Sequence, residues 1–177
     1  MAKSKNSGNR TSLIVLALAF VMTSIVFGLY FIKNSQLINK AAEQSETANW
    51  KTYINTKYGY KLRYPNDWRS PPSDQSEALF APRNAEGAPI GLSVTKSSLS
   101  DQITKRETEL ESAGYITKLE NYIANNAAGK KLIFNKDERQ GFDFFAEKDG
   151  NVYHFIGASG QFVNTASQIL STFKFLD

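Results

Sequence analysis

Residues 13–32 form an apolar run, LIVLALAFVMTSIVFGLYFI, in which no side chain carries a charge. An α-helix of this length extends about 30 Å, which matches the hydrocarbon thickness of a lipid bilayer. A helix also satisfies every backbone N–H and C=O group within the segment, as a lipid environment requires. The run therefore predicts one transmembrane helix, and the more polar residues that follow it must fold outside the lipid.

The charges that flank the run predict its orientation. Three basic residues and no acidic residue precede it: Lys3, Lys5 and Arg10. Two lysines follow the run, but two glutamates soon balance them. Because basic flanks tend to stay on the cytoplasmic side, we expect residues 1–12 to form a cytoplasmic tail. The rest of the chain then lies outside the plasma membrane, which makes this a single-pass protein with an extracytoplasmic domain.

A cleaved signal peptide is the alternative interpretation of the same run. The apolar cores of signal peptides usually span about 7–15 residues and end near a small-x-small cleavage site. This run is longer, and residues 33–37 (KNSQL) offer no such site. The chain contains no cysteine, which excludes lipid attachment of the lipoprotein type. The sequence therefore favours an uncleaved signal-anchor.

Residues 33–49 are polar and contain neither Gly nor Pro, which predicts a juxtamembrane stalk before a folded domain at residues 50–177. The net charge of +4 does not describe this domain, because residues 48–177 hold 16 Lys and Arg against 15 Asp and Glu. A nucleic-acid-binding domain normally carries a basic patch or stripe, and none stands out here. Without disulfides, the stability of the domain must come from an apolar core, which its length permits.

Hydrophobic periodicity predicts strands and a closing helix. Apolar residues alternate along residues 90–96, as in a half-buried strand. Asp149 and Gly150 separate two aromatic-rich segments and predict a tight β-hairpin. Helical spacing near the end of the chain predicts an amphipathic helix with this apolar face: Phe162, Ala166, Ile169, Leu170 and Phe173.

A second helix is predicted between Ser98, a candidate N-cap, and Gly114, a natural C-terminal stop. Its apolar stripe contains Leu99, Ile103, Leu110 and Ala113, and Arg106 interrupts it. The order of elements is then strands, helix, several antiparallel strands and helix. That order predicts an α+β fold in which helices flank an antiparallel sheet.

The usual sequence signatures of catalysis are missing. Residues 157–161 (GASGQ) approach the G-x-S-x-G nucleophile elbow, but Gln161 replaces the second glycine. No GxxxxGK[ST], GxGxxG or HExxH motif occurs. The acidic residues around the Asp149 hairpin, including Asp143, do not match EF-hand spacing and are expected to be solvated. With one histidine and no cysteine, the sequence predicts no enzyme, no cofactor and no metal site.

Four residues are candidates for binding a small ligand: Tyr60, Tyr64, Trp68 and His154. The three aromatic rings could form a stacking surface, with the histidine as a polar group beside them. The competing interpretation is structural, because aromatic side chains on a hairpin supply large buried areas to a core. A lone histidine within a strand is likewise more often packed or hydrogen-bonded than a ligand.

Two stretches of this sequence resemble PsbP-like domains. Residues 53–68 (YINTKYGYKLRYPNDW) contain an aromatic-Gly-aromatic turn followed by Tyr-Pro-x-x-Trp, and residues 169–175 (ILSTFKF) are similar to the family's terminal helix-to-strand segment. The founding members are extrinsic subunits of the oxygen-evolving photosystem, and this chain looks like their membrane-anchored bacterial relatives. The resemblance implies an α/β/α sandwich and a role in binding or assembly instead of catalysis. Family metal sites do not carry over, because no matching ligand cluster is present.

These features predict a membrane-anchored, extracytoplasmic PsbP-like domain that binds or stabilises another membrane or envelope protein. The alternative is an extracytoplasmic domain that binds a small ligand in a pocket lined by the four candidate residues. That alternative requires a concave, partly exposed aromatic cleft. Neither function involves nucleic acid.

Overall fold

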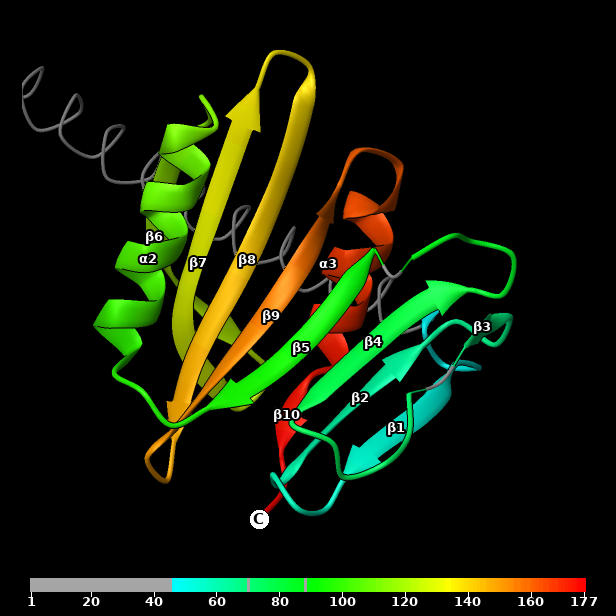
Figure 1. Cartoon of the computed structure of the whole chain (residues 1–177). Coiled ribbons are helices and arrows are strands. Elements are labelled where there is room, and N and C mark those ends of the chain that lie inside the picture. The colour runs from blue at the N-terminus through cyan, green and yellow to red at the C-terminus, as the bar shows by residue number, and fades with distance from the viewer. Residues whose placement is uncertain (1–45, 70, 88) are drawn as a thin grey trace, which may run out of the picture. The chain divides into compact units, whose positions relative to one another are not determined.

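Seven antiparallel strands form the larger sheet of the domain, in the order β3-β4-β5-β9-β8-β7-β6. The strands are β3 (Trp68–Arg69), β4 (Glu77–Pro82), β5 (Ile90–Thr95), β6 (Ile116–Ala124), β7 (Ala127–Lys136), β8 (Arg139–Lys148) and β9 (Asn151–Ser159). β9 returns to pair with β5, so the β6–β9 meander extends one side of the sheet (Figure 1). The computed structural model describes residues 46–69, 71–87 and 89–177.

A smaller sheet joins the two ends of the domain. It has the order β1-β2-β10, with β1 (Lys51–Asn55), β2 (Tyr60–Tyr64) and β10 (Lys174–Phe175). β10 pairs with β2 through Lys174 opposite Lys61 and Phe175 opposite Tyr60. The N–H of Arg63 also donates to Thr172 Oγ1 at 2.7 Å, so the first hairpin is fastened to the last elements of the chain.

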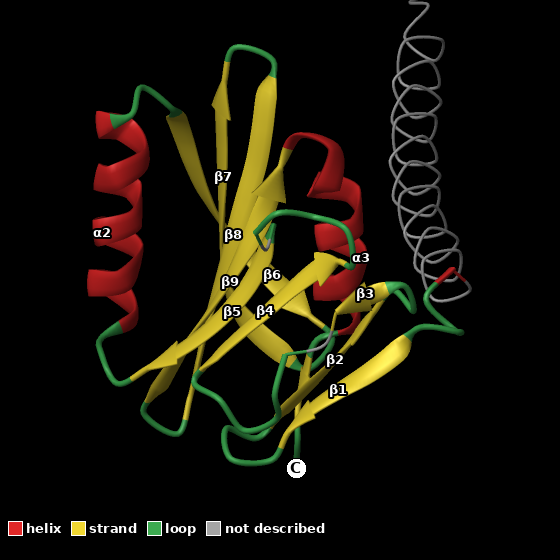
Figure 2. Cartoon of the chain, turned by 45° about the vertical axis from the view of Figure 1, so that its right-hand side comes forward, coloured by secondary structure: helices red, strands yellow, loops and turns green. Residues whose placement is uncertain are grey.

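Helices cover both faces of the larger sheet. α2 (Leu99–Ser112) packs against β6, β7 and β8. A 3-10 turn, η1 (Gly160–Phe162), leads into α3 (Val163–Thr172), which packs on the opposite face and against β2 (Figure 2). The predicted α+β fold with helices on an antiparallel sheet is confirmed for the part of the chain that the structure describes.

The predicted transmembrane run at residues 13–32 and most of the predicted stalk lie outside the described residues. Within the described ranges, no helix has the length and apolar character that a membrane crossing needs. The end of the predicted stalk belongs to the folded domain. Thr47 is buried, its carbonyl accepts from Arg63 Nη1 at 3.4 Å, and Asn66 Nδ2 donates to the Asn49 carbonyl at 2.8 Å.

Local sequence signals explain where several elements end. Ser98 Oγ accepts a hydrogen bond from the N–H of Asp101 at 3.0 Å and caps α2, while Gly114 follows the helix with φ of 83°. Asp149 and Gly150 both have positive φ, 53° and 71°, as a two-residue hairpin turn requires. These predictions from the sequence are confirmed.

The main core lies between the larger sheet, the smaller sheet and α3. Aromatic rings from all three meet there: the ring centroids of Tyr60 and Phe173 are 5.8 Å apart, and those of Tyr153 and Phe175 are 4.9 Å apart. A second cluster lies under α2, where Ile103 and Leu110 pack on the other face of the sheet. The sheet is therefore apolar on both faces where a helix covers it.

Two glycines allow neighbouring strands and rings to approach closely in the main core. A Cβ atom on Gly157 would lie 2.2 Å from the carbonyl oxygen of Phe142 and 2.9 Å from its ring. A Cβ atom on Gly129 would lie 2.1 Å from the carbonyl oxygen of Phe145. Both contacts are far shorter than an ordinary carbon–oxygen distance of about 3.3 Å, so glycine is required sterically at these positions.

The turn between β6 and β7 holds β10 in place through two asparagine side chains. Asn125 has a φ of 52°, and its Nδ2 donates to the carbonyl of Phe173 at 3.0 Å. Asn126 Oδ1 accepts from the N–H of Phe175 at 3.0 Å, and its Nδ2 donates to the Phe175 carbonyl at 3.2 Å. The amide of Asn126 thus takes the place of a neighbouring strand for β10.

Tyr60 provides a pH test of this core. Burial, followed by the nearby Tyr53, raises the pKa of the Tyr60 phenol far above its ordinary value of 10.0. Because the unfolded chain then ionises first, the stabilisation is complete below pH 10 and is lost as the pH rises further. We expect the free energy of unfolding, measured in urea, to fall less steeply above about pH 10 in Tyr60→Phe than in the native chain. Equal slopes for the two proteins would contradict this assignment.

Candidate functional site

Asp143 is a fully buried carboxylate on β8, beneath α2. Its side chain is 0% exposed, and Oδ2 accepts a hydrogen bond from Arg106 Nε at 2.6 Å. Its other oxygen, Oδ1, has no hydrogen-bond partner among the described residues. A buried charge normally requires a partner, so Arg106 is essential to the placement of this carboxylate. The prediction that Asp143 is solvated is wrong, because β8 turns this side chain toward the helix instead of toward water.

Arg106 reaches Asp143 from the inner side of α2. Its side chain is 27% exposed, its guanidinium lies 5.8 Å from the centre of the Phe134 ring, and Nη1 lies 3.4 Å from Glu109 Oε2. Burial opposes the charge of Arg106 and tends to lower its pKa, but the carboxylates of Asp143 and Glu109 together outweigh this effect and raise the pKa of the guanidinium. The residue that interrupts the apolar stripe of α2 is therefore the counterion of the buried acid.

His154 joins this pair from β9, the strand beside β8. Its Nε2 lies 3.3 Å from Asp143 Oδ2 without the alignment of a hydrogen bond, so the contact is an ion pair only when the ring is protonated. The imidazole stacks on Phe145, with ring centroids 4.2 Å apart and an angle of 15° between the planes. Its side chain is 14% exposed, which places it at the margin of the area that α2 covers.

An uncovered part of the same sheet face continues from His154. We define the open sheet face as the outer surface of β4, β5 and β9 formed by Leu79, Gly91, Ser93, His154 and Ile156. Ser93 lies opposite His154, and Gly91 lies opposite both Leu79 and Ile156. Leu79 is 46% exposed, although it is a large apolar side chain. In Figure 1 this face is turned toward the viewer, with α2 to its left.

A glycine, Gly91, lies at the centre of the open sheet face. A Cβ atom on Gly91 would lie 3.2 Å from Leu79 Cδ2 and 3.8 Å from Ile156 Cδ1. The two apolar side chains therefore lie over Gly91 from the flanking strands. The surface combines an apolar centre with the partly exposed polar side chains of His154 and Arg106 at one side. This combination suits the binding of another macromolecule.

The four residues predicted to bind a ligand do not form one group. Tyr60, Tyr64 and Trp68 are 0%, 4% and 6% exposed and belong to the main core. His154 points to the opposite face of the larger sheet, because its neighbours Tyr153 and Phe155 are the residues that face the main core. The aromatic positions therefore form packed core instead of the open cleft that the small-ligand alternative requires.

Among the described residues, no group of three or more His, Cys, Asp or Glu side chains is placed to hold a metal ion. Sequence reasoning missed the pairing of Arg106 with Asp143. Two signals could have found it together: an arginine inside the apolar stripe of a helix, and an aspartate within the aromatic run of residues 142–145 (FDFF). Each is a charged residue at a position that the periodicity assigns to the interior.

Comparison with known proteins identifies the fold. No protein-family model matches the sequence, and a search of curated proteins finds no match either. The solution structure of cyanobacterial PsbP (CyanoP) from Synechocystis sp. PCC 6803 is similar, with a TM-score of 0.50 and 13% sequence identity. The match covers 71% of this chain and 91% of that chain.

A crystal structure of a protein from Bacteroides thetaiotaomicron VPI-5482 also matches, with a TM-score of 0.46 and 14% identity. That match covers 72% of this chain and 49% of the other. At such low identity the likeness to the cyanobacterial protein shows the fold, and residue roles do not transfer. The folded domain of this chain is a PsbP-like domain in its fold, as the motifs at residues 53–68 and 169–175 predicted.

Proposed function

We propose that this protein is a non-catalytic binding or assembly module for another membrane or envelope protein. In this proposal, residues 13–32 anchor the chain in the plasma membrane, and the PsbP-like domain lies on the extracytoplasmic side. The observation that supports binding is the open sheet face, where the large apolar side chain of Leu79 on β4 is 46% exposed. The basic residues before the run support the orientation.

The chemistry of the open sheet face favours a protein surface as the partner. Interfaces between proteins commonly have an apolar centre and a polar rim, and arginine is enriched in them. Leu79 and Ile156 provide the apolar centre, while His154 and the half-buried Arg106 lie to one side.

Leu79→Arg is expected to reduce recovery of the partner at least about tenfold, because it places a charge in the apolar centre. The full chain would be crosslinked in the membranes of its own cells, and the partner would be quantified by mass spectrometry. The free energy of unfolding should change by only about 0.5 kcal/mol, since Leu79 is 46% exposed. Lys105→Glu on the exposed side of α2 is the control and should recover the partner normally.

Two results would overturn the binding proposal. One is the failure of native chains to recover any reproducible partner from crosslinked membranes. The other is equal recovery by Leu79→Arg and native chains, which would remove the open sheet face from the interaction. Either result would leave the PsbP-like fold unaffected.

The proposed orientation has a separate test, because the native chain contains no cysteine. A membrane-impermeant thiol reagent applied to intact cells should label Lys96→Cys, because Lys96 is exposed and directly follows β5. It should not label Lys5→Cys until the membrane is broken. Labelling of both variants, or of Lys5→Cys alone, would reject an N-terminus in the cytoplasm.

A further inference from the structure

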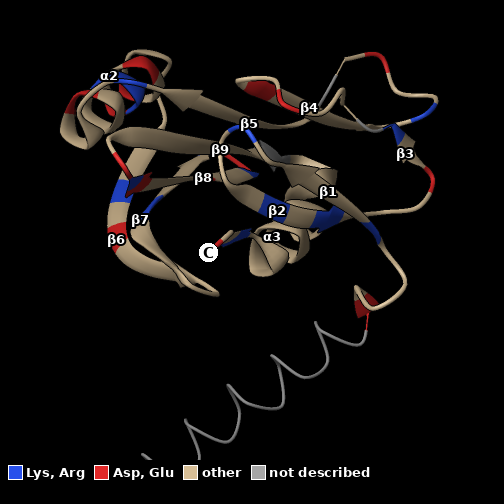
Figure 3. Ribbon diagram, turned by 90° about the horizontal axis from the view of Figure 1, so that it is seen from below, with Lys and Arg blue, Asp and Glu red and all other residues tan. Residues whose placement is uncertain are grey.

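β6 is an edge strand of nine residues that carries exposed apolar side chains. No described strand lies beyond it, and Figure 3 shows it at the margin of the sheet. Three of its apolar residues are exposed: Ile116 at 71%, Leu119 at 39% and Ile123 at 69%. An open edge strand offers unpaired backbone groups to another strand, so its surroundings decide what can pair with it.

The turn after β6 determines which backbone groups are available. Ala124 and Ala127 flank the two-residue turn and therefore form a hydrogen-bonded pair of the hairpin. Because hydrogen-bonded and non-hydrogen-bonded pairs alternate, the even-numbered residues of β6 pair with β7. The odd-numbered residues direct their N–H and C=O groups away from β7. These residues are Thr117, Leu119, Asn121 and Ile123. The free edge can thus accept an antiparallel strand.

We propose that β6 pairs with β6 of a second copy of this chain, antiparallel, with Leu119 opposite Leu119 of the partner subunit. In this register Lys118 lies opposite Glu120 of the partner subunit, and Glu120 lies opposite Lys118 of the partner subunit. Thr117 lies opposite Asn121 of the partner subunit, which matches two polar side chains. The strand is therefore complementary to itself in charge and polarity.

Neighbouring registers lose this complementarity. A relative shift of the two strands by two residues in one direction sets Lys118 opposite Lys118 of the partner subunit, and the same shift in the other direction sets Glu120 opposite Glu120 of the partner subunit. Directly opposed like charges destabilise a strand pair. Within one copy, Lys118 Nζ lies 3.4 Å from Glu120 Oε2, and the lysine side chain is 73% exposed. An exposed ion pair of this kind contributes little to stability. Lys118 and Glu120 can therefore exchange it for ion pairs with the partner subunit in the dimer.

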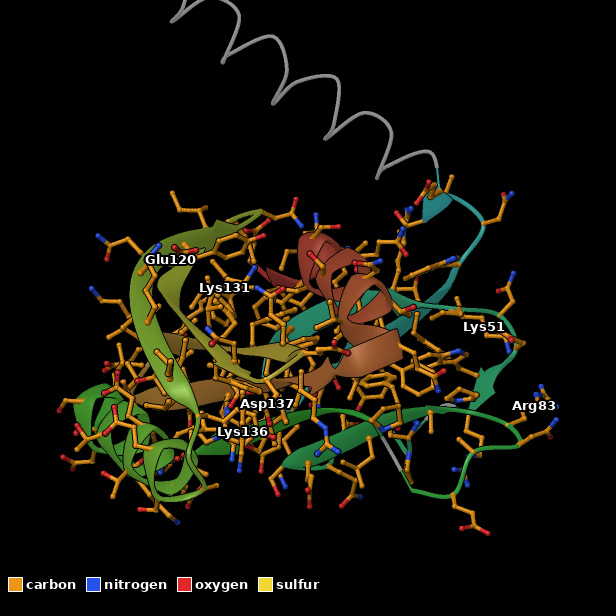
Figure 4. All side chains as sticks on the ribbon, turned by 90° about the horizontal axis from the view of Figure 1, so that it is seen from above. Lys51, Arg83, Glu120, Lys131, Lys136 and Asp137 are labelled. Atoms are coloured by element: carbon orange, nitrogen blue, oxygen red, sulfur yellow. The ribbon has the colours of Figure 1, made fainter. Side chains whose placement is uncertain are left out.

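The rest of the domain leaves room for this pairing. α2 packs across β6, β7 and β8, so its axis lies near β7, about 7 Å from the shared edge. Two copies of α2 would then lie about 14 Å apart, beyond the 8–10 Å of direct helix packing. Glu120 lies on the β6 side of the domain, far from Lys51 and Arg83 on the other side (Figure 4). The dimer would form a continuous sheet of fourteen strands, twice the seven of one copy.

Charge reversal on β6 tests the proposal directly. The full chain, purified in detergent, should form a dimer by sedimentation at about 100 µM, a concentration suited to an interface of modest area. K118E replaces two attractive cross-strand pairs with two repulsive ones, so dimerisation should weaken about tenfold or more. E120K should have the same effect. The double variant K118E/E120K should dimerise like the native chain, because it exchanges the two charges and keeps their complementarity.

Mixing the single variants supplies a second test that misfolding cannot imitate. K118E chains and E120K chains are each expected to remain monomeric, but an equimolar mixture should form heterodimers. Lys105→Glu makes the same change in net charge on α2 and should leave the dimer intact. A monomeric native chain would overturn the proposal, and so would dimerisation of K118E as strong as that of the native chain.

Cysteine substitutions test the register, since the native chain has none. Leu119→Cys should form a disulfide between subunits on mild oxidation, because directly opposed residues in a hydrogen-bonded pair have Cα atoms about 5.5 Å apart. Thr117→Cys alone should not, since the two cysteines would lie about 13 Å apart along the strands. Thr117→Cys mixed with Asn121→Cys should form the disulfide. Crosslinking by Thr117→Cys alone, with none by Leu119→Cys, would reject the register.

The dimer and the proposed binding function fail independently. Leu79 lies on β4, five strands away from β6 in the sheet, so Leu79→Arg should leave dimerisation unchanged. Conversely, K118E leaves the open sheet face intact. A dimer without a recovered partner would reject the proposed function alone, and a recovered partner without a dimer would reject the β6 pairing alone.

Discussion

Arg106→Met is expected to destabilise the domain by about 3–5 kcal/mol, because it leaves the carboxylate of Asp143 buried without a counterion. Asp143 is 0% exposed, and Arg106 Nε is its hydrogen-bond donor at 2.6 Å. Methionine keeps much of the apolar length of the arginine side chain, so the loss reports the missing charge more than missing packing. Urea denaturation at neutral pH would measure the change in the free energy of unfolding.

Removal of Asp143 and removal of Arg106 should lower the free energy of unfolding by different amounts. Asp143→Leu should cost less than Arg106→Met, because Arg106 is 27% exposed and its guanidinium can turn toward water. The double variant Arg106→Met with Asp143→Leu should recover most of the stability, since it replaces the ion pair with apolar contacts. Lys105→Met, one residue away on the exposed side of α2, is the control. If Arg106→Met lowers the free energy of unfolding by less than about 1 kcal/mol, the domain does not need Arg106 to neutralise the Asp143 carboxylate.

Gly157→Ala is expected to destabilise the domain by about 3 kcal/mol or more through overpacking. The added Cβ atom would lie 2.2 Å from the carbonyl oxygen of Phe142 and 2.9 Å from its ring. The oxygen belongs to β8 in the middle of the sheet, so relief requires a shift of the backbone instead of a rotation of one side chain. Thermal and urea unfolding of Gly157→Ala should both show this loss.

Gly91→Ala is the matched control, since Gly91 is also buried in a strand of the same sheet. Its added Cβ atom would meet Leu79 Cδ2 at 3.2 Å, and the half-exposed Leu79 side chain can move away. We expect Gly91→Ala to lower the free energy of unfolding by at most about 1 kcal/mol. Equal losses in the two variants would mean that a general glycine effect, and not the contact with Phe142, determines the result.

Much of the fold could be predicted because its signals are local. Asp149 and Gly150 specify their turn by backbone conformation alone, and Ser98 caps α2 with its own hydroxyl. The alternation of β5 and the helical spacing of α3 each reflect burial of one face. Such patterns can be recognised without knowing which elements pack together, so they identify the elements and their order correctly.

The candidate site could not be predicted, because it depends on contacts between residues distant in sequence. Arg106 and Asp143 are 37 positions apart, and each looks like a surface charge when considered alone. Tyr60 and Trp68 could equally line a cleft or fill a core, and only the position of α3 and β10 decides in favour of the core. The contact of Thr47 with the domain likewise depends on Arg63, which lies on β2.

The fastening of β2 to α3 and β10 has a consequence for biosynthesis. Arg63 and Thr172 are separated by 109 positions, so the cover of the first hairpin is incomplete until α3 has been made. Contacts of such long range form slowly, and an uncovered hairpin exposes its apolar face in the meantime. A ribosome-bound chain that stops before residue 163 should therefore remain sensitive to protease along residues 51–64. Completion of this domain therefore has to wait for the synthesis of α3 and β10.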